Sequence, residues 1–145
     1  MKKLIISLLM LVGVVAACQA RDEYSRDAGV LPQAARTVIG KNFKSKVGIV
    51  KIDKDFGRVS EYEVTLDDGT EITFDRNGNW KDVECNSRRS VPDGFILPAI
   101  RKYVAKNYKN VKIVGVEKER NGYEISLSNG IDMKFDKQGV FQKFD

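Results

Sequence analysis

The second half of this chain repeats the first, and this duplication restricts the fold more than any other feature of the sequence. Residues 62–84 align with residues 123–145 without a gap, from a shared Tyr-Glu pair to a shared glycine beyond Phe-Asp. Upstream, Leu31-Pro32 and Leu97-Pro98 open similar segments, and Gln33 is the only extra residue. A single unit of this size would bury a marginal core, so the two copies are expected to share one.

Each copy begins with an amphipathic helix. Apolar residues recur there at three- and four-residue spacing, which is the period of one helix face. They are Leu31, Ala34, Ala35, Val38, Ile39 and Phe43 in the first copy and Leu97, Ile100, Val104 and Tyr108 in the second. Pro32 and Pro98 fall in the first turn, where a proline is tolerated because its missing N–H would be unpaired anyway.

Four strands are expected after each helix. An apolar run at 49–52 is followed by Tyr62, Val64 and Leu66, which alternate with polar residues at the period of a strand with one buried face. Asp-Gly at 68–69 favours a hairpin turn before the return strand. We therefore predict an α+β fold: two tandem repeats, each a helix followed by a four-stranded antiparallel meander, forming one curved sheet with the helices on one face.

One face of this sheet should be open to water, because one helix for every four strands covers only one side. The residues predicted for the open face are Glu61, Glu63, Thr65, Glu71 and Thr73 from the first copy and Glu124, Ser126, Asp132 and Lys134 from the second. This polar face is either a recognition surface or simply a solvated one. Tyr62 and Tyr123 are expected in the core.

Residues 1–20 indicate a signal peptide. Lys2 and Lys3 precede an apolar stretch that is shorter than the about 20 residues needed to span a bilayer. Val15-Ala16-Ala17-Cys18 matches a lipobox, in which Cys18 would be acylated; alternatively, signal peptidase would cut after Ala20. Both alternatives predict export, either to the periplasm or as an outer-membrane lipoprotein whose only membrane attachment is Cys18.

The mature chain is expected to divide into a first repeat at 21–85, a polar linker at 86–94 and a second repeat at 95–145. Without Lys2 and Lys3 the net charge of +5 falls to about +3, which is too mild to predict a nucleic-acid partner. The sequence contains no histidine, which removes the usual general base and the commonest zinc ligand. Cys85 is interpreted as a small buried hydrophobe; the alternative, a reactive thiol, would lack a histidine base.

The turn at 75–79 offers the only metal-like pattern. Asp75, Asn77 and Asn79 place oxygens at every second position, but the glycine and the bidentate glutamate of a calcium loop are not at their expected positions. The second copy keeps only the aspartate and the glycine, which both serve a turn. We therefore predict a turn, no cofactor and no metal, with calcium at these three residues as the alternative.

Trp80 and its counterpart Phe141 follow the second turn of each copy. Core packing is one interpretation. The other is an exposed aromatic anchor, because tryptophan is enriched in binding hot spots, and on that basis Trp80 is included among the predicted binding residues.

The repeated unit, with Leu-Pro opening a helix and a meander containing Tyr-Glu-Val-Thr-Leu-Asp-Asp-Gly-Thr and Phe-Asp-Arg-Asn-Gly-Asn-Trp, resembles the PepSY-like proteins, also called beta-lactamase-inhibitor-like. The resemblance covers residues 30–145. It implies small secreted bacterial proteins with a concave sheet that grips an enzyme, and a kinship with domains proposed to inhibit peptidases. We therefore predict a non-enzymatic exported module that binds an envelope protein or peptide through the open face, with inhibition of an envelope hydrolase as its sharper form. The alternative is a small-ligand or calcium-binding protein.

Overall fold

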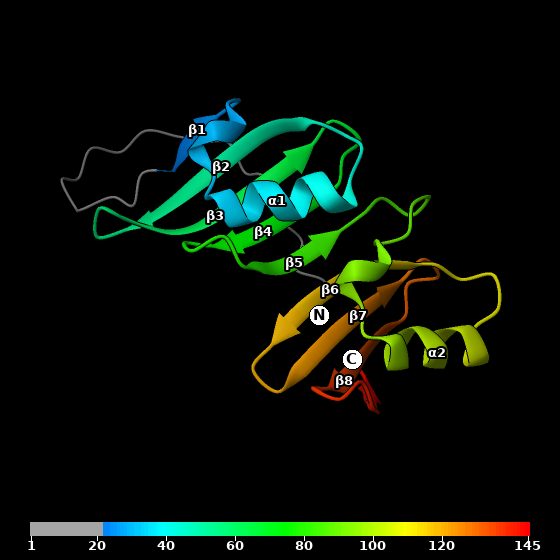
Figure 1. Cartoon of the computed structure of the whole chain (residues 1–145). Coiled ribbons are helices and arrows are strands. Elements are labelled where there is room, and N and C mark those ends of the chain that lie inside the picture. Colours follow the sequence, from blue (N-terminus) through cyan, green and yellow to red (C-terminus); the bar gives the residue numbers. More distant parts are fainter. Residues whose placement is uncertain (1–21) are drawn as a thin grey trace, which may run out of the picture.

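A computed structural model describes residues 22–145 of the chain (Figure 1). The predicted signal peptide and Cys18 lie outside the described residues. Within residues 22–145, no helix is both long enough and apolar enough to cross a membrane.

Residues 22–145 form two helices and nine strands. The helices are α1 (Gln33–Asn42) and α2 (Pro98–Asn107), with short 3-10 turns at Ala28–Val30 and Asp93–Phe95. The strands are β1 (Glu23–Ser25), β2 (Val47–Asp55), β3 (Arg58–Leu66), β4 (Glu71–Asp75), β5 (Trp80–Glu84), β6 (Ile113–Glu119), β7 (Gly122–Leu127), β8 (Asp132–Asp136) and β9 (Phe141–Phe144). Pro98 lies in the first turn of α2, as predicted, whereas Pro32 is the N-cap residue, one position before α1 begins.

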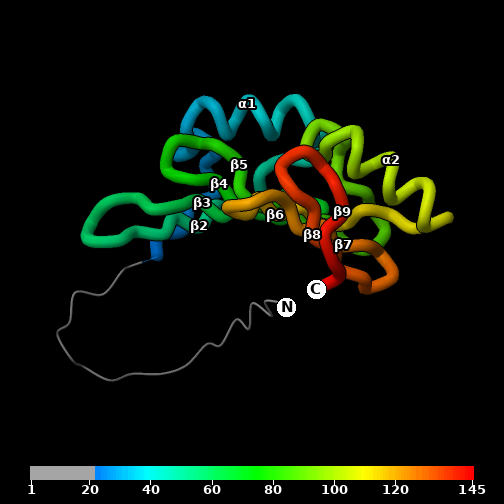
Figure 2. The backbone as a smooth tube through the Cα atoms, turned by 90° about the horizontal axis from the view of Figure 1, so that it is seen from below, coloured from blue at the N-terminus to red at the C-terminus, as the bar shows by residue number. Residues whose placement is uncertain are grey.

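All nine strands form one antiparallel sheet in which every strand pairs with its neighbours in the chain. Both helices lie on the same side of this sheet (Figure 2). The α+β class and the helix-covered face are therefore as predicted. Eight strands were predicted, and β1 is the additional one. Its three residues are too few to show an alternating pattern. It pairs with Val50–Ile52 of β2 at one edge of the sheet.

A single hydrophobic core lies between the helices and the sheet. Ala35 and Ile39 of α1 and Ile100 and Val104 of α2 are buried in it. The sheet contributes Val64, Phe74, Val83, Val116, Ile125 and Met133, all at most 1% exposed. Since Val83 of β5 pairs with Val116 of β6, the core runs without interruption from the first half of the chain into the second.

The segment at 86–94 is more than a solvated connection. Val91 within it is buried, and its N–H donates to the carbonyl oxygen of Ile113 at 2.8 Å. Cys85 is buried as interpreted, beside the hydroxyl of Thr70, and burial raises the pKa of its thiol. Tyr62 is buried and Tyr123 packs against the core, as predicted.

Candidate binding surface

The side of the sheet away from the helices is the candidate site, and we call it the open face. On β3, Tyr62, Val64 and Leu66 are buried, so the intervening residues point to the opposite side. The predicted residues that lie on this open face are Glu61, Glu63, Thr65, Glu71, Thr73, Glu124, Ser126, Asp132 and Lys134. The register of the strands brings all of them onto one surface.

Trp80 does not lie on the open face, so its predicted placement there was wrong. The pairing of β4 with β5 shifts by one residue between Thr73 and Phe74, so that Trp80 is opposite the buried Phe74. Its ring meets Phe95 edge to face at 5.2 Å, and the ammonium of Lys118 lies 3.8 Å from the ring centroid. The alternative interpretation of Trp80, core packing, agrees with the structure.

A line of paired residues crosses the open face, each opposite the next on the neighbouring strand. From β2 to β8 the line consists of Lys51, Glu63, Thr73, Asp82, Glu117, Glu124 and Lys134. A parallel line from β3 to β8 consists of Thr65, Glu71, Glu84, Gly115, Ser126 and Asp132. The middle of the open face is therefore acidic, with a lysine at each side.

Carboxylates oppose one another directly on this surface. Glu71 pairs with Glu84, Asp82 with Glu117, and Glu117 with Glu124. Like charges at directly opposed positions of an antiparallel sheet are destabilising. Side chains that lower the stability of a fold are expected at functional sites, so these pairs are the strongest indication that the open face binds something.

The two lysines at the sides each bridge three carboxylates. Lys51 Nζ lies 2.9 Å from Asp53, 3.5 Å from Glu63 and 3.7 Å from Asp22. Lys134 Nζ lies 2.9 Å from Glu119, 3.5 Å from Glu124 and 3.9 Å from Asp145. Although partial burial opposes it, the hydrogen bond to Asp53 and the surrounding carboxylates raise the pKa of Lys51. Both lysines are therefore held as cations.

Sequence reasoning missed Asp82, Glu84 and Glu117. The missing information was the pairing of β5 with β6, which joins the two halves. The apolar side chain of Val83 was the available clue, because once Val83 is buried its neighbours Asp82 and Glu84 must point to the other side.

Glu84 carries a carboxylate without an ion pair within residues 22–145. Its neighbours along the second line are Glu71 on one side and Gly115 on the other, with Ser126 and Asp132 beyond. Loss of hydration, followed by the charges of Glu71 and Asp132, raises its pKa. Loss of hydration likewise raises the pKa of Glu63 and of Glu124.

Replacing Glu84 with glutamine is expected to raise the melting temperature near neutral pH. The pKa of Glu84 is higher in the folded than in the unfolded protein, so ionising this carboxyl lowers the free energy of unfolding. The wild type regains that stability as the pH falls from neutral through the raised pKa toward the ordinary value of 4.5, because the carboxyl is then protonated. Melting curves of the wild type and Glu84→Gln should therefore differ at about pH 7 and converge at about pH 4. Glu61→Gln is the control, since Glu61 accepts a hydrogen bond from Lys81 at 2.9 Å and should gain nothing. A Glu84→Gln variant no more stable than wild type at neutral pH would contradict the assignment.

Two groups of oxygens are candidate cation ligands. Asp53, Glu61 and Glu63 each offer an oxygen, and these atoms lie within 4.8 Å of one another. The ammonium of Lys51 already contacts two of these carboxylates, so a metal ion there would have to displace it.

In the turn at 75–79, one oxygen of Asp75 accepts the N–H groups of Asn77 and Asn79, and the other accepts the Asn79 amide at 3.1 Å. Although burial opposes it, these hydrogen bonds lower the pKa of Asp75. They show that Asp75 stabilises the turn, which explains its presence without a bound metal ion.

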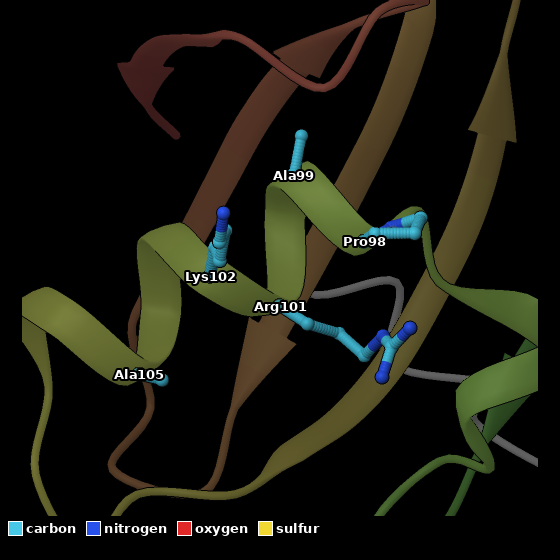
Figure 3. Close-up of a pocket in the computed structure, with 5 residues that line it drawn as sticks. All are labelled: Pro98, Ala99, Arg101, Lys102 and Ala105. Carbon is cyan, nitrogen blue, oxygen red and sulfur yellow. The ribbon is translucent and has the colours of Figure 1, made fainter.

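The hollow drawn in Figure 3 is less suited to a ligand. It lies along α2, between Pro98 and Ala105. Its charged side chains diverge, because Lys102 points one way and Arg101 another, toward Asp93. A specific pocket needs polar groups that converge, so the open face remains the candidate site.

Comparison with known proteins agrees with the fold. Residues 60–143 match a family model described as "Putative beta-lactamase-inhibitor-like, PepSY-like". A comparison with curated proteins found no match.

Solved structures resemble the chain over nearly all of the described residues. A "putative periplasmic protein of unknown function" from Bacteroides vulgatus ATCC 8482 is 43% identical, with a TM-score of 0.80, over 86% of this chain and 99% of that chain. A "putative calcium-regulated periplasmic protein" from Bacteroides thetaiotaomicron is 36% identical, with a TM-score of 0.77, over 86% of this chain and 96% of that chain. A further periplasmic protein from B. vulgatus, also described as putative, is 35% identical, with a TM-score of 0.75 and the same two coverages, 86% and 96%.

Proposed function

This chain belongs to the PepSY-like, beta-lactamase-inhibitor-like family, and from that premise we propose that it is a non-enzymatic exported module that binds a basic segment of an envelope protein or peptide through its open face. The protein acts in the periplasm, where its structural neighbours are described as residing, either free or anchored through Cys18. The likeness of its two halves reflects duplication of one helix-and-meander unit.

The three directly opposed carboxylate pairs carry this proposal. The whole chain has a formal net charge of +5, yet the middle of the open face is acidic. A partner that places lysine or arginine side chains over Glu71/Glu84 and Glu117/Glu124 would relieve the repulsion within the face. Complementary charge of this kind accelerates association and selects the partner.

The test is a binding titration with a defined probe. A synthetic peptide of alternating lysine and threonine presents its cations on one side when extended, and a glutamate-threonine peptide is the negative control. We expect the protein to bind the lysine peptide, less tightly as salt increases, and the Glu63→Lys/Glu124→Lys variant to bind at least about tenfold more weakly. A pull-down from envelope extract with the same two proteins would then identify the natural partner.

Two comparisons make the result specific. The Asp55→Lys/Asp93→Lys variant changes the net charge equally, at exposed carboxylates outside the acidic middle of the face, and should bind as the wild type does. All three proteins should fold, because Glu63 and Glu124 are outside the core, but Glu63→Lys/Glu124→Lys should melt at a lower temperature, since it loses two ion pairs and places lysine opposite Lys51 and Lys134. Equal binding by both double variants would refute the open face as the site. If Glu63→Lys/Glu124→Lys does not fold, the titration is repeated with Glu63→Gln/Glu124→Gln.

Calcium binding is the second candidate function. It is favoured by the carboxylate group Asp53, Glu61 and Glu63, and one structural neighbour is described as calcium-regulated. The same titration with calcium chloride distinguishes the two functions. A calcium-induced rise in melting temperature that disappears in Glu61→Gln would assign this group, whereas one that survives Asp75→Ala would exclude the turn at 75–79.

A further inference from the structure

Two apolar side chains are exposed on the open face where it reaches β1, which lies beside β2 at the edge of the sheet (Figure 1). Tyr24 is 63% exposed and Ile49 is 38% exposed. Tyr24 pairs with Lys51 and Ile49 pairs with Thr65, so both lie on the side of the sheet away from the helices. Neither belongs to the side chains that pack against the core of residues 22–145. Core packing therefore does not explain either residue.

Tyr24 and Ile49 are close enough to form one surface. They are diagonal neighbours across β1 and β2, because Ile49 lies two residues before Lys51, the partner of Tyr24. Diagonal positions of an antiparallel pair are within reach of an aromatic side chain. The ammonium of Lys51 lies 2.9 Å from Asp53, on the side of Lys51 away from Ile49, so it leaves the space between the two apolar residues free of charge. We call Tyr24 and Ile49 the β1–β2 patch.

The β1–β2 patch adjoins the two lines of residues that cross the open face. Tyr24 begins the first line, and Ile49 begins the second by preceding Thr65. Beyond Thr65, the second line continues to Glu71 on β4 and Glu84 on β5. Since neighbouring strands lie about 4.8 Å apart, Ile49 is about 10 Å from Glu71 and about 14 Å from Glu84 across the sheet.

An extended peptide that crosses the strands can reach the patch and the carboxylates together. In an extended chain, residues four apart point to the same side and are about 14 Å apart. A peptide with an apolar side chain on the β1–β2 patch would therefore place a cation four residues away over Glu71 and Glu84. An anionic membrane surface fits this region poorly, because the three carboxylates bridged by Lys51 outnumber its single ammonium and would repel lipid phosphates.

We propose that the β1–β2 patch anchors an apolar side chain of the bound segment, which carries lysine or arginine about four residues away. Because the open face must first bind a basic segment, this assignment rests on the proposed function, and it adds the sequence pattern that the face selects. Tyr24 and Ile49 contact the apolar side chain, while the opposed carboxylates contact the cations. An aromatic contact beside complementary charges makes recognition depend on the sequence of the partner as well as on its net charge.

Matched synthetic peptides test the anchor. Each peptide has three lysines that alternate with threonines, and one of each pair carries phenylalanine four residues from its nearest lysine where the other carries threonine. One pair has this position before the lysines and a second pair has it after them, since a peptide can cross the strands in either direction. In at least one pair, the wild type should bind the phenylalanine peptide about tenfold more tightly than the threonine peptide.

The Tyr24→Ser/Ile49→Thr variant should lose this preference and bind both peptides as the wild type binds the threonine peptide. The matched control is Phe144→Ser/Val140→Thr, which removes an aromatic and a β-branched side chain, each 57% exposed, at the opposite edge of the sheet. Phe144 pairs with the buried Met133 and so lies off the open face. The control variant should keep the tenfold preference.

The outcomes separate the anchor from the proposed function. A wild type that binds the phenylalanine and threonine peptides equally would overturn the anchor and leave the acidic middle as the binding site, whereas binding of neither would overturn both. A preference that survives in Tyr24→Ser/Ile49→Thr, or disappears equally in the control variant, would also overturn the anchor. If Tyr24→Ser/Ile49→Thr does not fold, the single variants Tyr24→Ser and Ile49→Thr decide, and each should reduce the preference.

Discussion

Replacing Gly122 with alanine should lower the free energy of unfolding by about 3 kcal/mol or more. Gly122 begins β7, opposite Asp136 of β8. A Cβ atom placed on Gly122 would lie 1.9 Å from the carbonyl oxygen of Phe135 and 2.8 Å from the Cα of Asp136. Both neighbours are backbone atoms, so relief requires β7 and β8 to move apart and lose hydrogen bonds of their ladder.

Urea titration of Gly122→Ala beside Gly40→Ala would measure this effect. Gly40 is exposed on α1, and a methyl group added there would meet no atom of residues 22–145 within 4 Å beyond its own helix backbone. Gly40→Ala should therefore raise stability by about 1 kcal/mol, because alanine favours the helix. Opposite signs for one chemical change would confirm that the close approach of β7 and β8 is responsible. A Gly122→Ala protein as stable as wild type would show that the two strands are farther apart.

Replacing Phe74 with alanine should cost about 3–5 kcal/mol, whereas replacing its neighbour Thr73 should cost less than about 1 kcal/mol. Phe74 is 0% exposed and lies in the core beneath the helices. Thr73 belongs to the line of residues that crosses the open face, where it pairs with Glu63 and Asp82. The difference arises because deletion of the ring leaves a cavity, while deletion of the hydroxyl and methyl exposes only surface.

This pair tests the sidedness on which the candidate site depends. Denaturant midpoints for Phe74→Ala, Thr73→Ala and the wild type are sufficient, because both variants lie on one short strand. Comparable losses in the free energy of unfolding at the two positions would mean that the open face is also covered. It could then not serve as the proposed binding surface.

Most of the fold follows from local patterns in the sequence. The alternation around Tyr62 and Val64 identifies which side of β3 is buried, and the Leu-Pro pairs locate both helices within a residue. These inferences succeed because each depends on neighbours a few residues apart. Placing Glu63 and Glu124 on one face follows in the same way from their aligned positions in the two halves.

The failures share a different cause. Trp80 was included among the open-face residues because tryptophan is enriched in binding hot spots, and the bulge that places it opposite Phe74 depends on how two strands meet. The opposed pair Asp82 and Glu117 was missed because it exists only where β5 meets β6, more than thirty residues apart in the chain. The alternation of apolar and polar residues along one strand does not predict contacts that depend on the register between two strands.

The unbroken order of the strands affects how the protein matures. The proposed function includes export, in which a chain emerges from the translocation channel with its amino-terminal part first, and here each strand finds its partner in the strand that came just before it. No early segment must wait, unpaired, for a distant one to arrive. Sheets built from such local contacts close their loops at low entropic cost and tend to form quickly. The first half of the sheet can therefore be assembled, and can serve as a template, while the second half is still crossing the membrane.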